Sequence, residues 1–192
     1  MQRIRGFTIV ELLVVIVIIG ILLMLSIFMI SSNRANARDA ERKADIENLA
    51  RGLETRYKQG NSRVSAPSYV SAGSYPGADE MRHIMGVSVA GFTPAQISGG
   101  YPRDALPGTE VASFSPPGVS GSFIGFGIVC TSSCGAARDA ATIGSSVTKD
   151  NYYYQPIDAS GNVCIQGGCV RFQLFWREEV TGNLQVVESR RQ

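Results

Sequence analysis

The sequence predicts an α+β fold in which one long N-terminal helix packs its second half on a C-terminal antiparallel β-sheet. Two observations lead to this fold class. From Phe7 to Gln59 the chain contains no proline and no turn cluster, and the run ends only at Gly60-Asn61-Ser62. Beyond residue 122, short segments rich in aromatic and β-branched residues alternate with turn signals. One unbroken helix over residues 7–59 is roughly 80 Å long.

The first half of this helix is apolar on nearly every face. No charged residue occurs from Leu12 to Ile30. As a helix, residues 7–30 measure roughly 36 Å, which is enough to cross a hydrocarbon core of about 30 Å. Arg3 and Arg5 precede the apolar run and favour an N-terminus on the cytoplasmic side of the membrane. We therefore expect a transmembrane helix over residues 7–30.

A cleaved secretory signal peptide is the alternative interpretation of this segment. Ala35-Asn36-Ala37 offers an A-x-A cleavage site behind a basic N-terminal stretch. The apolar run of about 24 residues is longer than the usual 7–15, however, and the A-x-A site lies inside predicted helix. We therefore prefer the transmembrane interpretation.

The second half of the helix, residues 31–59, carries a single apolar stripe. The stripe follows helical spacing and consists of Ile46, Leu49, Ala50, Leu53 and Tyr57. Opposite charges four residues apart, at Asp39–Lys43 and Glu47–Arg51, add local support. Such a stripe needs an apolar surface to cover it, and the chain after residue 60 must supply that surface.

The predicted sheet provides this surface. We expect strands over residues 123–130, 151–155, 169–178 and 184–188, with a hairpin loop at Thr181-Gly182-Asn183. In the third strand Val170, Phe172, Leu174 and Trp176 share one face, which we expect to lie on the helix. Residues 60–122 are rich in Gly, Ser and Pro and predict loops, with a short helix or strand near Glu80–Met85.

Four cysteines fall in two close pairs, Cys130 with Cys134 and Cys164 with Cys169. An even number of cysteines in an exported domain favours disulfides, and four cysteines allow three pairings. A zinc site with four cysteine ligands is the alternative. Its ligand loops usually read CxxC, whereas these read CTSSC and CIQGGC with no histidine or acid cluster beside them. We expect disulfides.

Residues 6–12 read GFTIVEL and match the G|FT-x-x-E-L processing motif. The chain therefore resembles type IV pilins and the related pseudopilins of type II secretion. The resemblance is close over residues 1–59 and extends to the remainder only in architecture. It is specific because a short basic leader, a Gly-Phe pair, a glutamate at a fixed distance and an apolar helix occur together. The pilin fold that it implies, a long helix packed on an antiparallel sheet, agrees with the layout predicted above.

The resemblance implies cleavage by a prepilin peptidase between Gly6 and Phe7, followed by N-methylation of the new Phe7 amine. The chain then consists of a leader peptide (1–6), a transmembrane and assembly half-helix (7–30), an amphipathic half-helix (31–59) and an exported globular β-rich domain (60–192). Gram-negative pilins often carry a proline in the membrane helix, where this chain has Phe28. A kink or melted segment over residues 20–28 is thus not implied here, although Gly20 is a weak point for a helix.

Glu11 is a carboxylate inside an apolar segment, which is costly at membrane depth. The helix dipole favours an acid in the first turn by roughly 0.3–1 kcal/mol, less than the roughly 2.5–3.5 kcal/mol cost at the bilayer centre. We expect the Phe7 amine of a neighbouring subunit to neutralise it, so that Glu11 sets the register during assembly. The alternative is an unpartnered acid at the level of the lipid headgroups.

The sequence offers no convincing catalytic, cofactor or metal site, and we expect no enzyme activity. His83 is the single histidine and lacks a nearby partner for Ser-His-Asp or Cys-His chemistry. Gly125-Phe126-Gly127 lacks the third glycine of a dinucleotide site. Residues 158–162 are too short for a calcium loop and predict a β-turn. The three tyrosines at 152–154 predict alternating strand residues rather than a stacking platform.

Charge also argues against a general nucleic-acid binder. Of the 18 basic residues, Arg3 and Arg5 precede the apolar run, which leaves 16 to match the 16 acidic residues. A protein that binds nucleic acid generally needs a basic face to release counterions.

Together these features predict a structural subunit of a type IV pilus. The expected partners are copies of itself and minor pilins, the prepilin peptidase and methyltransferase, the assembly platform and the membrane. The expected location is the cytoplasmic membrane as a single-pass precursor, and then a filament on the cell surface. A pseudopilin of a type II secretion or competence system is the alternative, and a membrane-anchored or secreted enzyme is a remote one. Adhesion, twitching motility and DNA uptake are left open, as is major or minor status.

Overall fold

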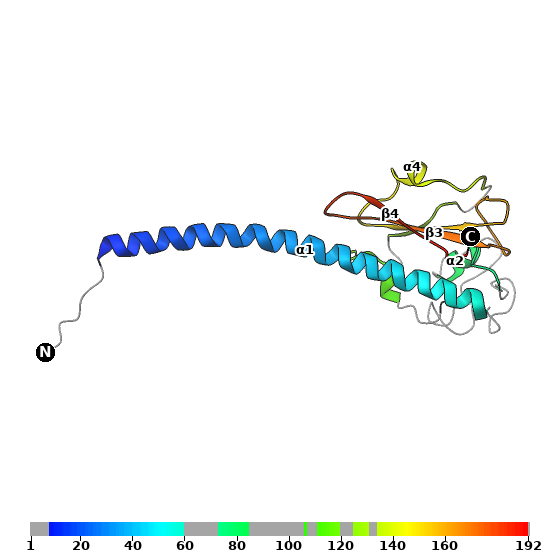
Figure 1. Cartoon of the computed structure of the whole chain (residues 1–192), viewed down its shortest axis with the longest axis horizontal. Coiled ribbons are helices and arrows are strands. Elements are labelled where there is room, and N and C mark those ends of the chain that lie inside the picture. Colours follow the sequence, from blue (N-terminus) through cyan, green and yellow to red (C-terminus); the bar gives the residue numbers. More distant parts are fainter. Residues whose placement is uncertain are drawn as a thin grey trace.

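The structure, a computed structural model of the chain, describes residues 8–59, 73–84, 106, 111–119, 125–130 and 134–191. A long rod leaves a compact head that contains all the other described elements (Figure 1). The rod is the first half of helix α1 (Ile9–Gln59), which runs for 51 residues. The predicted continuous helix is therefore confirmed. It passes through residues 20–28 without interruption and curves gently.

The head contains a four-stranded sheet in the order β1-β2-β3-β4. The strands are β1 (Phe126–Ile128), β2 (Tyr152–Ile157), β3 (Arg171–Arg177) and β4 (Leu184–Glu188). All four lie within or beside the predicted segments. β2, β3 and β4 are antiparallel, with Leu174 opposite both Tyr154 and Val187. β3 and β4 form the predicted hairpin, and Gly182 in its loop has φ = 71°, which glycine adopts readily.

β1 departs from the antiparallel pattern because it pairs with β2 in parallel, Gly127 opposite Tyr153. A parallel pair needs a long crossover between its strands. Residues 129–151 provide it and include the short helix α4 (Ala140–Ile143). The sheet is therefore antiparallel over three strands, and its edge strand β1 is parallel to β2 instead of antiparallel as predicted. The residues of β1 show no pattern that indicates the direction of the strand.

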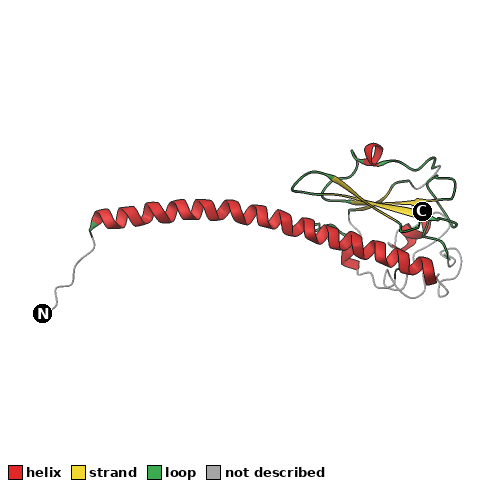
Figure 2. Cartoon of the chain, viewed as in Figure 1, coloured by secondary structure: helices red, strands yellow, loops and turns green. Residues whose placement is uncertain are grey.

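The second half of α1 lies against one face of the sheet (Figure 2). Ile46, Leu49 and Leu53 are each at most 1% exposed, and Ala50 and Tyr57 pack around them at the edge. The predicted stripe is thus confirmed. Its partners on the sheet are large side chains of β2 and β3: Tyr152, Tyr154, Phe172, Leu174 and Trp176. Burial of this apolar surface, at about 25 cal/mol per Å², attaches the head to the helix.

The opposite face of the sheet is also covered. Phe175 is fully buried there with Ile143 and Val147, which lie in and just after α4. The sequence pattern predicted an apolar face only on the helix-facing side of β3. The chain between β1 and β2 supplies this second cover.

Two short helices complete the described head, α2 (Ala78–Ile84) and the 3₁₀ helix η2 (Val111–Phe114). α2 is the short element predicted near residue 80, and η2 lies against α1. Most of residues 60–122, predicted as loops, lies outside the described residues.

Candidate assembly site

The first half of α1 presents apolar side chains in every direction. From Ile9 to Leu25, and again at Ile30, its large hydrophobic residues are 47–85% exposed. The window Ile9–Ser26 has a mean hydropathy of 3.1 and none of it is buried inside the chain. We call Ile9–Ile30 the apolar segment. A helix satisfies its backbone hydrogen bonds internally, so such a segment can enter lipid or a dry bundle of helices.

Glu11 is bonded at the start of this helix. The Thr8 amide N–H and the Thr8 hydroxyl both donate to Glu11 Oε2, each at 2.9 Å. In return the Glu11 amide donates to Thr8 Oγ1 at 3.3 Å, and the Leu12 amide donates to the Thr8 carbonyl at 3.2 Å. This reciprocal pattern is a capping box, in which a Thr and a Glu three residues apart satisfy amides that the first helical turn leaves unpaired.

The capping box gives Glu11 a partner within its own chain, which is compatible with both interpretations of this residue. Thr8 was not among the predicted site residues, although the T-x-x-E spacing of residues 8–11 is a sequence signal for this cap. Both bonds from Thr8 fall on Oε2, so within the described residues Oε1 remains open to a further donor. Gly6 and Phe7, the predicted processing residues, lie outside the described residues.

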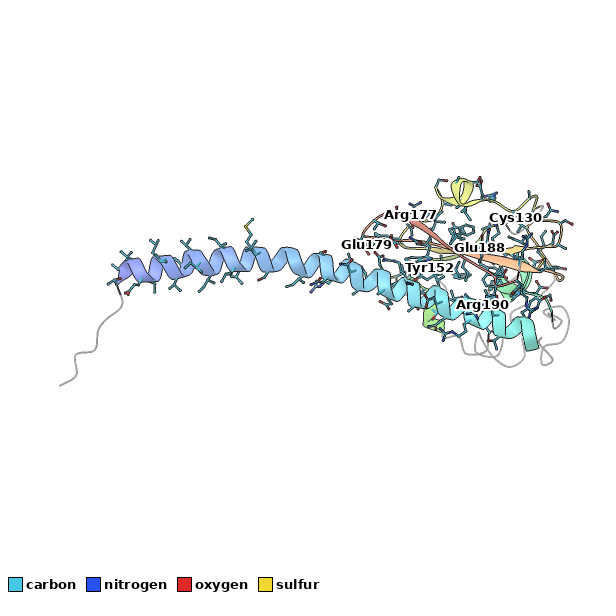
Figure 3. The ribbon with its side chains drawn as sticks, in the orientation of Figure 1. Cys130, Tyr152, Arg177, Glu179, Glu188 and Arg190 are labelled. Atoms are coloured by element: carbon cyan, nitrogen blue, oxygen red, sulfur yellow. A yellow bond between two sulfur atoms is a disulfide. The ribbon has the colours of Figure 1, made fainter. Side chains whose placement is uncertain are left out.

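A second site lies where α1 enters the head. There the loop between β3 and β4 is bound to α1 by charged side chains, at the end of the head nearest the apolar segment (Figure 3). Arg38 binds Glu179 through two hydrogen bonds, of 2.6 and 2.8 Å. Arg42, only 1% exposed, binds Glu179 at 3.1 Å and Asp39 at 2.8 Å. We call Arg38, Asp39, Arg42 and Glu179 the hairpin clamp.

Asp39 completes the hairpin clamp by accepting two backbone hydrogen bonds from the loop. The amides of Glu179 and Val180 donate to its two carboxylate oxygens at 2.7 and 3.0 Å. The paired arginines, Arg38 first, lower the pKa of Glu179 to about 2. Burial raises the pKa of Asp39, but the two amide donors and Arg42 outweigh it and the net shift is downward. The predicted local pair Asp39–Lys43 is replaced by these tertiary contacts, which no sequence spacing indicates.

All four cysteines form disulfides, Cys130–Cys134 and Cys164–Cys169. The structure thus selects one of the three pairings, and the sulfurs serve as covalent links rather than as zinc ligands. In the second loop Cys164 is 5% exposed and Cys169 is fully buried.

The structure also shows the roles of the predicted turn at residues 158–162 and of the three tyrosines at 152–154. Asp158 accepts the amides of Ser160 and Asn162 in a tight turn, as predicted for residues 158–162. Tyr152 and Tyr154 are buried on the helix side of β2, and Tyr153 packs on the other side. His83 lies within α2, and its side chain is outside the described set.

Comparison with known protein families identifies the N-terminal segment. Residues 1–27 match the family described as the prokaryotic N-terminal methylation motif. Neither the curated proteins nor the solved structures gave a significant match. The matched residues contain the predicted processing motif, the capping box and most of the apolar segment.

This motif is the class III signal peptide typical of type IV pilins and pseudopilins, and it implies processing by a prepilin peptidase, membrane insertion and export. Behind it the chain has the pilin-like α+β arrangement of a long helix packed on a mostly antiparallel sheet. The chain therefore carries a prepilin-like N-terminus in front of a pilin-like fold.

Proposed function

We propose that the protein is a structural subunit of a type IV pilus, which polymerises through its N-terminal helix into a surface filament. One observation carries the proposal. The head covers the second half of α1 closely, whereas no described residue covers the apolar segment. A bilayer can cover that segment in the precursor. Outside the bilayer, the apolar segments of other copies are the matching surface.

In this proposal Gly6 and Phe7 are the processing and methylation residues and Glu11 is the assembly residue. Cleavage after Gly6 gives Phe7 a positively charged amine, which methylation keeps charged. Glu11 Oε1 accepts a hydrogen bond from the Phe7 amine of a neighbouring copy, while Oε2 keeps its bonds to Thr8. Loss of one partner of a buried ion pair typically costs about 3–5 kcal/mol, enough to select one register.

Two variants separate the charge of Glu11 from its capping role. Glu11→Gln keeps a side chain that can complete a capping box but removes the charge. Thr8→Val removes the hydroxyl cap, worth about 1 kcal/mol, but keeps the charge. We expect Glu11→Gln to lower the yield of sheared filaments about tenfold or more and Thr8→Val to lower it far less.

The control is the intact mass of each mature chain, which should show loss of residues 1–6 and addition of one methyl group in both variants. Equal filament yields for Glu11→Gln and the unmodified chain would contradict the pairing role. A deficit in Thr8→Val as large as that in Glu11→Gln would assign the effect to the cap instead.

A pseudopilin of a type II secretion or competence system is the second candidate, since the N-terminal motif and the fold serve both. The amount and place of the fibre distinguish the two. Long fibres of this chain in sheared surface fractions support the pilus, and a small amount that stays with the cell envelope supports the pseudopilin.

A further inference from the structure

Val180 lies at the tip of the β3–β4 hairpin and is 51% exposed. Among the described residues, it is the one exposed large hydrophobic side chain outside the apolar segment. A single exposed apolar residue is ordinary on a protein surface. Its setting is what separates Val180 from an ordinary surface residue.

The hairpin clamp holds the backbone of this tip in place. Asp39 accepts the amides of both Glu179 and Val180, and two arginines of α1 bind the Glu179 carboxylate. Beyond Val180, the Thr181 hydroxyl donates to Glu178 and the Asn183 amide donates to Thr181 Oγ1. A rigid loop that already presents its apolar side chain loses little conformational entropy when a partner covers it.

The position of Val180 argues against lipid as that partner. The apolar segment of 22 residues is roughly 33 Å long as a helix, so it fills a hydrocarbon core of about 30 Å. Asp39, which binds the Val180 amide, lies nine residues beyond Ile30, or about 14 Å further along the axis. The headgroup layer is only about 5–8 Å thick on each side. Val180 therefore lies outside the bilayer while the chain is a membrane protein.

A second copy supplies the matching surface once subunits are staggered along a filament. A copy displaced outward by about 14–47 Å brings some part of its 33 Å apolar segment level with Val180. A contact of this kind joins two different patches, the hairpin tip of one copy and the helix of the next. Repeated contacts between different patches build open helical assemblies.

We propose that the tip of the β3–β4 hairpin, with Val180 at its apex, is a subunit contact that packs on the apolar segment of a staggered second copy. The proposal rests on the filament function given above. It adds to Glu11 a second assembly contact on the head, held in position by the hairpin clamp.

Photo-cross-linking in assembled filaments tests the proposal. A benzophenone amino acid replaces Val180 in the full chain, which is assembled together with isotopically labelled unmodified copies. The control replaces Ala159, an exposed residue near Tyr57 at the far end of the head from the clamp. We expect irradiation to join position 180 to the labelled peptide that contains the apolar segment, and position 159 to give no such product.

Substitution gives a second test that does not need the cross-linker. Val180→Ser should lower filament yield at least threefold relative to Ala159→Ser, which also adds a hydroxyl at an exposed site. Both variants should keep the unfolding midpoint of the head, followed by the fluorescence of Trp176, the single tryptophan, which is 5% exposed. This readout excludes a loss of folding as the cause of a lower yield.

The outcomes separate the two proposals. Filaments that form normally but give only lipid adducts, head-to-head products or no product at position 180 would overturn the hairpin contact and leave the filament function standing. An unmodified chain that forms no filament with its assembly machinery would overturn both.

Discussion

Asp45 lies on α1 beside Ser113 of η2 and Tyr152 of β2, and its side chain is half-buried there. The Tyr152 hydroxyl donates to Oδ2 at 3.3 Å. Burial raises the pKa of Asp45 to about 6, because the bonds from Ser113 and Tyr152 compensate only in part and Glu41 adds repulsion. The folded state thus binds a proton between about pH 4 and 6 that the unfolded state has already released. Stability must fall as the pH rises through this interval and stay lower above it.

Asp45→Asn should remove this dependence, because the amide cannot ionise and its oxygen still accepts from Tyr152. The difference between 3.8 and about 6 corresponds to at most about 3 kcal/mol. We expect a gain of about 1–2 kcal/mol at pH 7.5, after allowance for partial solvent screening, and almost none at pH 4. Denaturant unfolding of detergent-solubilised protein at both pH values checks this. An equal change at the two pH values would show that packing, not ionisation, decides the effect.

At the scale of elements, the Cys164–Cys169 loop holds α2 and the segment before it. The amides of Tyr75 and Ala78 donate to the carbonyls of Cys169 and Cys164 at 2.8 and 3.0 Å. The Gly167 amide, inside the loop, donates to Glu80, whose side chain is 4% exposed and whose pKa burial raises. The Cys130–Cys134 link has half-buried cysteines instead.

Removal of the two disulfides should therefore have unequal effects. Both links close loops of about five residues, so the entropy lost by the unfolded chain is similar, about 2 kcal/mol. We expect the Cys164→Ser/Cys169→Ser pair to cost about 2–4 kcal/mol, because the loop's contacts with α2 loosen as well. The Cys130→Ser/Cys134→Ser pair should cost about 2 kcal/mol or less. Unfolding curves followed by Trp176 fluorescence measure both, and equal losses would contradict a specific role of the second loop.

The elements themselves were largely predictable, for identifiable reasons. α1 contains no proline, and its stripe from Ile46 to Tyr57 keeps helical spacing, so its extent and its buried face follow from periodicity. In the β3–β4 hairpin, the turn residues Thr181-Gly182-Asn183 lie between the two strands that pair. The parallel pairing of β1 was not predictable, because a three-residue strand has no pattern that tells direction.

At the scale of the whole molecule, α1 has two halves with different partners. Residues of the second half lie in the same core as the sheet, whereas no described residue of the head buries any part of Ile9–Ser26. The free energy of unfolding of the head and the free energy of burying the apolar segment are therefore separate quantities. Substitutions in one half should leave the other property unchanged, since distant sites without shared partners are usually additive.

Leu49→Ala, within the core, should lower the unfolding free energy of the head by about 2–5 kcal/mol. Ile16→Ala, within the apolar segment, should leave it unchanged, and both variants should still insert into membranes. Trp176 fluorescence during denaturation and carbonate extraction of membranes report the two properties. A loss of head stability in Ile16→Ala would show that the halves of α1 are coupled.

The sequence by itself determined the N-terminal processing motif, the apolar segment, the continuous helix with its buried stripe, the approximate positions of the four strands and the C-terminal hairpin. Each of these is encoded by residues close together in the chain, through spacing or uninterrupted composition. The tertiary structure alone decided the hairpin clamp, the second cover of the sheet, the parallel edge and the choice of disulfide pairing. Arg38 and Glu179 are 141 residues apart, and only the packing of the hairpin beside α1 brings their charges within 2.6 Å. The reason is physical: periodicity reports which face of an element is buried, whereas the partner of a surface charge depends on how the finished elements meet.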